Sequence, residues 1–408
     1  MSKAGFLEKL LDGAEVEWKA LGAVAILRRG RVMSKGYLAD NAGEYPVYSS
    51  QTANNGMIGK IETFDFDGEF VSWTTDGANA GTVFYRLGRF SITNVCGVIK
   101  SNGTLPLNLK FIYYWLSTEA QKHVYSGMGN PKLMSNQVAK IPIPIPCPNE
   151  PEKSLAIQAE IVRILDAFTE LTAELTAELT AELTARKKQY NHYRDQLLTF
   201  EGGEVEHLPM GDERVGKFIR GGGLQKKDFV EAGVGCIHYG QVYTHYGTFA
   251  HTTKTFVSEE FAKKARMAKT GDVVIATTSE NDEDVCKAVA WLGDKDIAVS
   301  SDACFYSHKL NPKFVSYFFQ TEQFQKQKRG HITGAKVRRV NADALEKILI
   351  PVPSPEEQAR IVAILDKFDA LTTSLSEGLP REIELRQKQY EYYRDLLLNF
   401  PKPEEVAA

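Results

Sequence analysis

The sequence has few of the features that mark membrane proteins, secreted disulfide scaffolds and the common enzyme families. Nowhere in its 408 residues does an uninterrupted run of about eighteen apolar residues occur, which excludes an evident membrane-spanning helix. The first residues, MSKAGFLEKLLDGAEVEW, contain no apolar core followed by a small-residue cleavage site, as a secretory leader would. The sequence therefore predicts a chain that works in the cytoplasm and does not contact a membrane.

Cysteine and histidine are too sparse and too scattered to indicate a cross-linked or metal-bound framework. The five cysteines are odd in number and form no C-x-x-C pair, so they predict neither disulfide bonds nor a zinc site. The histidines lack the i, i+4 spacing beside a carboxylate that a helical metal site needs. The motifs G-x-x-x-x-G-K-[ST], G-x-G-x-x-G and G-x-S-x-G are absent as well. We therefore predict no catalytic residue and no metal in this chain.

What the chain does have is length and an uneven distribution of charge. Its 408 residues suffice for two sizeable hydrophobic cores, and its formal net charge is only −3. Residues 1–150 and 205–350 have formal charges of +2 and +3, whereas residues 151–200 and 351–408 have −2 and −4. The whole chain is thus unlike a typical DNA-binding protein, but two of its regions are compatible with nucleic-acid binding.

An internal repeat is the most informative feature of the sequence. AEIVRILDAF (159–168) returns as ARIVAILDKF (359–368), and KKQYNHYRDQLLTF (187–200) returns as QKQYEYYRDLLLNF (387–400), both 200 residues later. Weaker matches at offsets of about 190 to 208 are IPIPCP (143–148) with IPVPSP (350–355), LKFIYYWLSTEAQ (109–121) with PKFVSYFFQTEQF (312–324), EVEWKALG (15–22) with EVEHLPMG (204–211), and SITNVCGVI (91–99) with VSSDACFYS (299–307). The repeat predicts globular parts at 1–150 and 201–352, helical segments at 151–200 and 353–400, and a tail at 401–408.

The helical segments contain the word TAEL three times in succession, within TELTAELTAELTAELTARKKQY (169–190). Glu, Ala and Leu are strong helix formers, and leucines four residues apart form a row that rotates by about 40° per repeat. Two helices of equal length can bury such rows against each other as an antiparallel pair. The predicted seam consists of Leu171, Leu175, Leu179 and Leu183 with Leu371, Leu375, Leu379 and Ile383. Gly378 and Pro380 should kink or break the second helix.

The TAEL repeat has two interpretations. Leucine at helical spacing is commonly just a packed core. A unit that can be gained or lost whole would instead act as a ruler, since one copy adds about 6 Å of helix, close to the rise of two base pairs at about 3.4 Å each.

Two kinds of residue in the globular parts are candidates for contacts with DNA. Basic residues that could neutralise phosphates are Arg28, Arg29, Arg31, Lys35 and Lys132 in the first part, and Arg220, Lys226, Lys227, Lys326, Lys328, Arg329, Lys336, Arg338 and Arg339 in the second. Side chains that could contact base edges are Gln51, Asn54, Asn55, Thr74, Thr75 and Asn79, and Gln241, Tyr243, Thr277, Thr278 and Ser279. Basic clusters can equally be solvated surface, and such polar residues are common in turns. Both interpretations stay open.

The segments around the start of the helices resemble those of a known family. IPVPSPEEQARIVAILDKFD (350–369), its weaker copy at 143–168 and the TAEL word are similar to the specificity (S) subunit of type I restriction-modification systems. The likeness covers essentially the whole chain. The first copy departs from the pattern, because Ile157 stands where the second copy has Glu357, and NEPEKSL lengthens the entry to the helix.

The resemblance implies an α+β architecture in which two similar α/β target-recognition domains are separated by two long antiparallel α-helices, a coiled coil with internal pseudo-two-fold symmetry. Each domain would read one half of a bipartite, asymmetric site on double-stranded DNA, and the helices would set the spacer. Two modification (methyltransferase) subunits using S-adenosylmethionine would dock on the chain, and two restriction (translocase and nuclease) subunits using ATP and Mg could join. The chain itself would be non-catalytic and without cofactor, in the bacterial cytosol.

The ends of the helical segments carry tyrosines with two open interpretations. Tyr190, Tyr193, Tyr390 and Tyr393 could form surfaces for partner subunits or the DNA backbone, or could pack within their own helices. A second class of function also remains at this stage, that of a coiled-coil adaptor between proteins that does not bind DNA.

Overall fold

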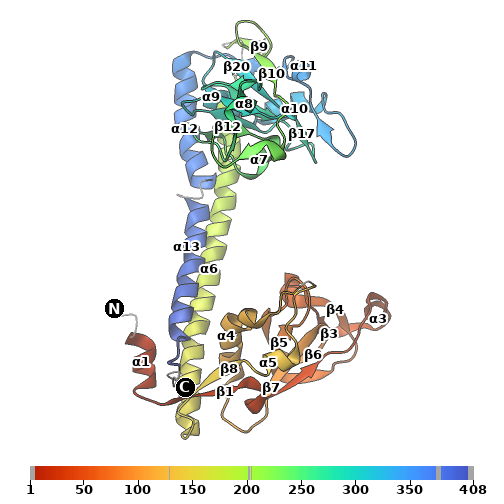
Figure 1. The fold of residues 1–408 in the computed structure, drawn as a ribbon, viewed down its shortest axis with the longest axis vertical. Helices are drawn as coiled ribbons and strands as arrows, with labels where there is room; N and C mark the ends of the chain where they lie inside the picture. The colour runs from red at the N-terminus through yellow and green to blue at the C-terminus, as the bar shows by residue number, and fades with distance from the viewer. Residues whose placement is uncertain (1–4, 128, 201–202, 204, 374–377, 403–408) are drawn as a thin grey trace. The chain divides into compact units, whose positions relative to one another are not determined.

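The computed structural model describes residues 5–127, 129–200, 203, 205–373 and 378–402. The chain divides into two compact units, unit 1 formed by residues 1–176 and 385–408 and unit 2 by residues 177–384. Each unit combines an α/β globular part with stretches of the long helices (Figure 1). No helix in these described ranges is long and apolar enough to cross a membrane.

Unit 1 is built on a six-stranded sheet in the order β2-β7-β5-β6-β3-β4. Its neighbours are antiparallel except for β3 and β6, which run parallel. The strands are β1 Val16–Ala20, β2 Ala25–Arg29, β3 Ala42–Tyr48, β4 Met57–Ile61, β5 Phe66–Thr74, β6 Val83–Ile92, β7 Cys96–Ser101 and β8 Pro142–Pro146. The helices are α1 Gly5–Leu11, α2 Leu21–Val24, α3 Lys35–Asp40, η1 Ala53–Gly56, α4 Leu109–Glu119, η2 Ala120–His123 and α5 Ser135–Val138. The apolar face of α4, with Phe111 and Trp115, belongs to the core that also contains Trp73 and Ile99 of the sheet.

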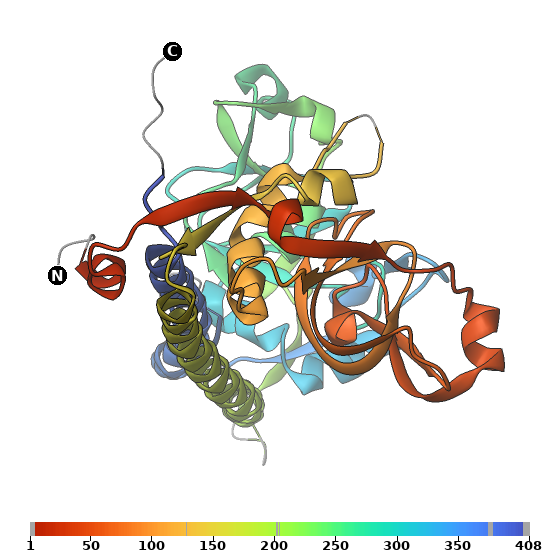
Figure 2. The same ribbon diagram turned by 90° about the horizontal axis from the view of Figure 1, so that it is seen from below.

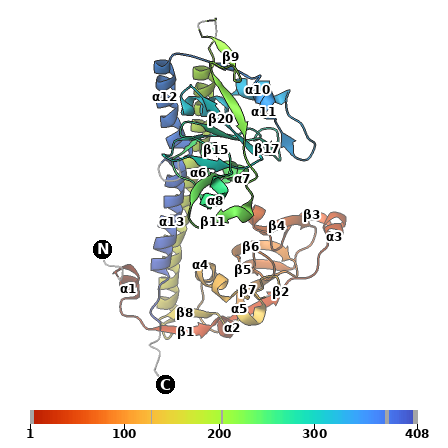
Figure 3. The ribbon, with the colours of Figure 1, turned by 45° about the horizontal axis from the view of Figure 1, so that its top comes forward.

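Unit 2 contains two five-stranded sheets, ordered β10-β20-β16-β18-β13 and β11-β14-β12-β19-β15. Figure 3 labels β20 of the first sheet and β11 and β15 of the second. Its strands are β9 His207–Pro209, β10 Gly216–Arg220, β11 Phe229–Val230, β12 Val234–Ile237, β13 Phe249–Ala250, β14 Thr255–Val257, β15 Met267–Ala268, β16 Val273–Ala276, β17 Thr278–Ser279, β18 Ala288–Trp291, β19 Ile297–Val299, β20 Ala303–His308, β21 Arg338–Arg339 and β22 Leu349–Pro351. Its helices are η3 Lys226–Asp228, α7 Tyr239–Thr244, α8 Glu259–Ala262, α9 Pro312–Phe318, α10 Glu322–Arg329 and α11 Ala342–Leu345. The strand β16, VVIA, is buried along its whole length because other elements cover both its faces.

The predicted internal repeat corresponds to a duplicated backbone arrangement. In unit 1, EVEWKALG forms β1, which pairs antiparallel with β8 from IPIP, and the two strands lie side by side (Figure 2). In unit 2, EVEHLPMG forms β9, which pairs antiparallel with β22 from IPVP. The same register places Lys19 opposite Ile143 and Leu208 opposite Ile350. Each globular part is therefore closed where its first and last strands meet, just before the long helix begins.

One of the predicted sequence matches is wrong by one residue. The match of SITNVCGVI with VSSDACFYS sets Cys96 against Cys304. In the structure the Gly30 N–H donates to Cys96 O and the Gly221 N–H to Ala303 O, so Cys96 corresponds to Ala303. A slip of one residue in a strand moves every side chain to the opposite face, which sequence similarity alone does not register.

The long helices pair antiparallel within each unit, as predicted. Helix α6 runs from Pro151 to Leu198 without interruption, since its residues are mostly strong helix formers. The second segment forms two helices, α12 Pro355–Thr373 and α13 Leu379–Leu397, with residues 374–377 outside the described ones. In unit 1 the Phe168 ring on α6 stacks on Tyr393 of α13 at 5.6 Å, and in unit 2 the Phe368 ring of α12 stacks on Tyr193 of α6 at 5.7 Å.

The predicted leucine seam is only partly formed. Leu171 is 50% exposed and Leu371 is 36% exposed, whereas Thr372 is buried. The partly buried members of the predicted row are Leu175, Leu179, Leu183, Leu379 and Ile383, and Leu375 lies outside the described residues. A four-residue repeat overshoots one helical turn, so a leucine row rotates out of a straight seam and neighbouring threonines enter it.

The helix-end tyrosines pack between helices and also contact side chains of their own helix. Tyr190 is buried and its ring lies 6.4 Å from that of Phe368. Tyr390 accepts a hydrogen bond from the Thr169 hydroxyl on α6 at 3.1 Å. Tyr193 and Tyr393 stack across the pair and remain 39% and 41% exposed. Within their own helices, the Arg194 guanidinium lies 5.5 Å from the centroid of the Tyr190 ring and that of Arg394 lies 5.9 Å from the Tyr390 ring, so intrahelical packing is confirmed in part. A contact of the exposed ring faces with partners stays a prediction.

Candidate nucleic-acid interface

In unit 1, three of the predicted DNA-binding residues come together at the ends of β2 and β5. The Arg29 guanidinium donates to the carbonyl oxygen of Asn94 and lies 3.8 Å from the Asp76 carboxylate. Lys132 Nζ lies 3.9 Å from the same carboxylate, and the Thr75 hydroxyl donates to it at 2.6 Å. These five residues, Arg29, Thr75, Asp76, Asn94 and Lys132, form what we call the unit 1 cluster. Arg29 and Lys132 are exposed, so their charge is available to an anion.

In unit 2, four predicted residues line one pocket of about 520 Å³. This unit 2 pocket contains Arg220, Thr277, Thr278 and Arg339, together with Ser301, Asp302, Ala303, Cys304, Val340, Asn341, Ala342 and Asp343. The Arg220 side chain donates to the Ser301 carbonyl oxygen at 3.3 Å, and the Thr277 hydroxyl donates to that of Asp302 at 3.0 Å. The strand pairing of β17 with β21 sets Thr278 opposite Arg339.

The unit 1 cluster and the unit 2 pocket are built on the same backbone frame. The Thr75 N–H donates to Val95 O at 2.9 Å, and the Thr277 N–H to Asp302 O at 3.0 Å. The Leu133 N–H donates to Thr75 O, as the Val340 N–H does to Thr277 O. The Gly30 N–H donates to Cys96 O as the Gly221 N–H does to Ala303 O. The residue before each of these equivalent donors has an equivalent place as well. Arg29 is therefore equivalent to Arg220, and Lys132 to Arg339, in places far apart in the sequence.

A glycine follows the strand-ending arginine in both units. A Cβ on Gly30 would lie 2.2 Å from the carbonyl oxygen of Ile92, and one on Gly221 would lie 2.1 Å from that of Ser300. Such distances are far below van der Waals contact, so only glycine allows the strand end to approach the neighbouring loop. This close approach holds each arginine against the loop that carries Asn94 or Ser301.

Other predicted residues of unit 1 are exposed but lie in separate places. Arg28 lies on β2 and Lys35 begins α3. Arg31 is held by the Asp65 carboxylate at 3.0 Å and by the Tyr37 hydroxyl at 3.1 Å, contacts that raise the pKa of its guanidinium. The candidate amides Gln51 and Asn79 are only partly exposed and are engaged internally, since Asn79 donates to Ser50 O at 2.9 Å and Gln51 donates to Met57 O at 2.6 Å. Asn54 and Asn55 are exposed on a turn with φ of 50° and 53°.

The remaining candidates of unit 2 are divided between free surface and internal bonds. Lys226, Lys227, Lys326 and Lys336 are exposed. Arg329 lies 3.5 Å from Glu322, and Arg338 pairs with Asp282, which holds the pKa of that carboxyl below its usual value. Ser279 is partly buried on β17. Gln241 bonds the His238 N–H and the Thr255 hydroxyl, and Tyr243 donates to Thr278 O at 2.9 Å. These last two side chains fix helix α7 and are not directed freely outward.

Four predicted contact residues are buried, and three of them have no surface for a contact with DNA, whereas Thr278 still lines the unit 2 pocket. Thr74 and Thr75 have no exposed surface, and Thr278 is 8% exposed. Lys328 is fully buried, and its ammonium donates to the carbonyl oxygens of Glu283 and Val285 at 3.0 and 2.9 Å. Burial lowers the pKa of this lysine. A lysine in a basic run looks like surface in the sequence, but α10 directs this one inward, where it satisfies two carbonyl oxygens of the turn before β18.

Sequence reasoning missed the acidic and small polar residues that accompany the basic ones. Asp76 and Asn94 in the unit 1 cluster, and Ser301, Asp302 and Asp343 in the unit 2 pocket, were not candidates. The only signal was the similarity of SITN, which ends at Asn94, to VSSD, which ends at Asp302. In the residues that the structure describes, no group of three or more His, Cys, Asp or Glu side chains could hold a metal ion. All five cysteines are buried, and burial raises the pKa of the Cys96 thiol to about 12.

Two α/β units, each with two cations at equivalent positions of one shared backbone frame and each attached to a stretch of the same long helix, define an internally duplicated binding protein. The sequence profile described as Type I restriction modification DNA specificity domain matches residues 14–185 and 218–385. The chain belongs to the family of type I restriction-modification specificity subunits.

Individual relatives agree with this family over nearly the whole chain. The chain is 38% identical to the type I restriction enzyme EcoR124I/EcoR124II specificity subunit of Escherichia coli, with 100% of both chains covered. It is 35% identical to the putative specificity subunit S.HindORF215P of Haemophilus influenzae, covering 97% of this chain and 98% of the relative. Its fold is similar to a chain of a solved type I restriction-modification system studied for complex assembly and conformational transition, with a TM-score of 0.66, 15% identity, and coverage of 94% and 97%.

Proposed function

We propose that each unit reads one half of a bipartite, asymmetric site on double-stranded DNA, through the face that carries the unit 1 cluster or the unit 2 pocket. The basic residues Arg29 and Lys132 in unit 1, and Arg220 and Arg339 in unit 2, contact phosphates and fix the register of each unit on the duplex. Base edges are read by amide and hydroxyl side chains on the neighbouring turns, with Asn54 and Asn55 the most accessible in unit 1.

One observation carries this proposal. Two segments with little sequence similarity build the same hydrogen-bonded frame, and both frames place a cation at the same two positions. Two copies of one scaffold with different polar residues around it would allow both units to bind DNA in the same way while each reads a different base sequence. The positive formal charges of residues 1–150 and 205–350 have the sign that DNA requires.

We further propose that α6 and its partner helices determine the number of unread base pairs between the two half-sites. One TAEL copy spans about 6 Å, or just under two base-pair steps of about 3.4 Å. Deleting residues 176–179 should shift the preferred spacer by one or two base pairs and leave both half-sites unaltered. Glu178→Gln, which changes the charge of one copy but not its length, is the matched control and should keep the original spacer. Methylation of a target series with graded spacers measures the shift, and altered half-sites would contradict the ruler.

Catalysis is assigned in this proposal to partner subunits. Two modification subunits that use S-adenosylmethionine would methylate adenine after flipping it from the stack, and two restriction subunits would supply ATP- and Mg-dependent translocation and cleavage. The exposed faces of Tyr193 and Tyr393 are candidate docking surfaces. Such a complex would work in the bacterial cytosol, where its DNA substrate is.

A gel-shift series tests the proposed DNA binding. The chain together with the modification subunits should bind its target with an affinity that falls steeply as salt rises from about 50 to 200 mM, because bound cations displace counterions from the phosphates. Scrambling either half-site should weaken binding. An affinity that depends on neither salt nor sequence would instead point to a protein adaptor, the alternative that no contact in the described residues favours.

A further inference from the structure

Each globular part is attached to the long helices by a set of side-chain bonds that lies outside the candidate nucleic-acid interface. In unit 1 the Asp166 carboxylate on α6 accepts hydrogen bonds from Lys110 Nζ and from the Tyr114 hydroxyl, both at 2.7 Å and both from α4. Gln158, two turns earlier on α6, accepts the N–H of Asn108 at 2.8 Å. Asn108 in turn caps the N-terminus of α4.

Unit 2 repeats these bonds with the same residue types. The Asp366 carboxylate on α12 accepts hydrogen bonds from Lys313 Nζ and from the Tyr317 hydroxyl on α9, both at 2.8 Å. Gln358 accepts the N–H of Asn311, the N-cap of α9, at 2.7 Å. Matching distances in the two units thus differ by only 0.1 Å.

The lysine of each set also contacts an aromatic ring of the central sheet. Lys110 Nζ lies 5.5 Å from the centroid of the Tyr85 ring on β6, and Lys313 Nζ lies 3.7 Å from that of the Phe249 ring on β13. A cation over a ring is attracted by the ring's negative face. The lysine therefore connects the sheet to the helix carboxylate and does not merely pair two helices.

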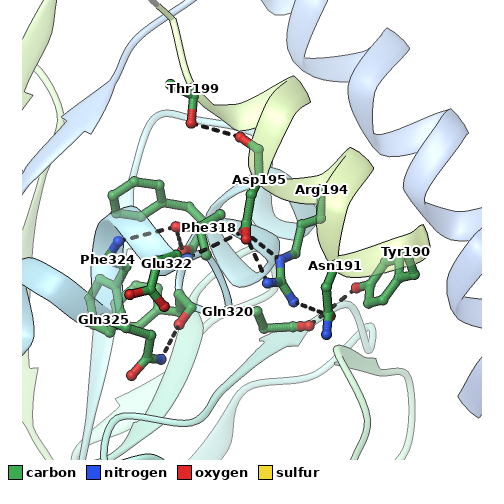
Figure 4. A network of polar contacts seen from close by, with 12 residues as sticks. Tyr190, Asn191, Arg194, Asp195, Thr199, Phe318, Gln320, Glu322, Phe324 and Gln325 are labelled. Carbon is green, nitrogen blue, oxygen red and sulfur yellow. Dashed lines mark hydrogen bonds and ion pairs between the residues drawn. The ribbon is translucent and has the colours of Figure 1, made fainter. Parts of the chain in front are cut away.

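Both sets extend to the second helix of the pair. In unit 1 the Thr169 hydroxyl, 3.3 Å from the Tyr114 hydroxyl, donates to Tyr390 on α13. In unit 2 the Tyr190 hydroxyl on α6 donates to Gln320 at 3.1 Å, and Asp195 accepts the N–H of Glu322 at 3.2 Å (Figure 4). The globular part of unit 2 is consequently bonded to two helices, whereas in unit 1 the bonds reach the second helix through Thr169 of the first.

These bonds add little to stability for the number of groups they use. The Asp166 and Asp366 side chains are 37% and 32% exposed, and water screens ion pairs with such exposure, so they contribute little to the free energy of folding. Their geometry is more specific than their energy, since one carboxylate is held from two directions while a buried glutamine fixes the next contact. Such an arrangement fixes the angle between the globular part and its helix, and not only their contact.

We propose that Asp166 and Asp366 are positioning residues that fix the angle of each globular part on its helices and so restrict the spacer lengths that the complex accepts. This inference rests on the proposed reading of a bipartite site. A globular part of about 150 residues has a radius of about 15 Å. A tilt of about 13° would move a point at that radius by about 3.4 Å, one base-pair step. A small loss of angular restraint is therefore enough to admit a neighbouring spacer.

The test measures methylation by the full complex with its modification subunits, on DNA targets with the preferred spacer and with spacers one base pair shorter and longer. Asp166→Asn with Asp366→Asn should reduce the preference for the preferred spacer about fivefold, because the neutral amide lacks the charge that attracts the lysine ammonium and has one acceptor oxygen in place of two. Preference for each half-site should be unchanged. Glu160→Gln is the matched control, since this α6 carboxylate bonds only Arg163 in the described structure and should leave spacer preference intact.

Tyr114→Phe with Tyr317→Phe provides a milder variant in case the aspartate variants fold poorly. It removes the hydroxyl bond to each carboxylate, and in unit 1 also the contact with Thr169, but it leaves the carboxylate and its lysine in place, so we expect a smaller change in the same direction. General weakening of the fold would lower methylation on all spacers equally, so the ratio between spacers reports on angle alone. An unchanged ratio in the folded variants would overturn the positioning role. If the unaltered complex shows no half-site preference, the proposed function fails instead.

Discussion

Replacement of Arg339 by alanine tests whether the unit 2 pocket contacts phosphates. Arg339 is exposed at the rim of a pocket of about 520 Å³ and occupies the position that Lys132 has in unit 1. One lost phosphate contact lowers the slope of log affinity against log salt by about 0.9. The ratio of the affinity of the unaltered chain to that of Arg339→Ala should therefore fall about 3.5-fold as salt rises from 50 to 200 mM.

The assay is a fluorescence-anisotropy titration of the target duplex at four salt concentrations, with the modification subunits present. Lys295→Ala is the matched control, because Lys295 is also an exposed cation of unit 2. It precedes β19, whereas the pocket residues Ser301 and Asp302 follow that strand. An unchanged slope with altered preference at one base position would show that Arg339 reads a base. An unchanged slope and an unchanged preference would remove the pocket from the interface.

Two further predictions concern buried groups of unit 2. Burial lowers the pKa of His308 from 6.5 to about 4, so the unfolded chain binds a proton that the folded chain does not. The contribution of His308 to the free energy of unfolding is then fully present above pH 6.5 and falls by about 3 kcal/mol as pH drops to about 4. The variant His308→Asn keeps an acceptor for the Leu310 N–H but does not titrate. Urea unfolding of this variant should therefore show a smaller loss of stability over the same pH range. Lys328→Met leaves two carbonyls without their charged donor and should cost about 2 kcal/mol in the free energy of unfolding. Its DNA affinity per folded molecule should not change, and a reduced salt slope would mean that Lys328 reaches the DNA after all.

Local composition and repetition were sufficient to predict the large-scale architecture. Residues 151–200 contain no glycine or internal proline, and the segment 159–200 recurs 200 residues later, which together specify long helices of matched length. The repeat also showed that the words forming β1 and β8 recur as β9 and β22, but only the structure showed that each first strand pairs with its last one. These features depend on near neighbours in the chain and on a count of residues, and both are visible in the sequence.

The composition of the candidate interface was decided only by tertiary structure. Residue type suggested Lys328 and Thr74 as contacts as readily as Arg339, but burial of a side chain depends on which distant segments cover it. Asp76 and Asp302 joined the basic residues because strand ends far apart in sequence meet there. The TAEL repeat and the recurrence of segment 159–200 were enough to predict the long helices to which the two units are attached. Long-range packing alone decided which cations face outward, because the sequence pattern of a basic cluster is the same whether its side chains meet solvent or a buried carbonyl.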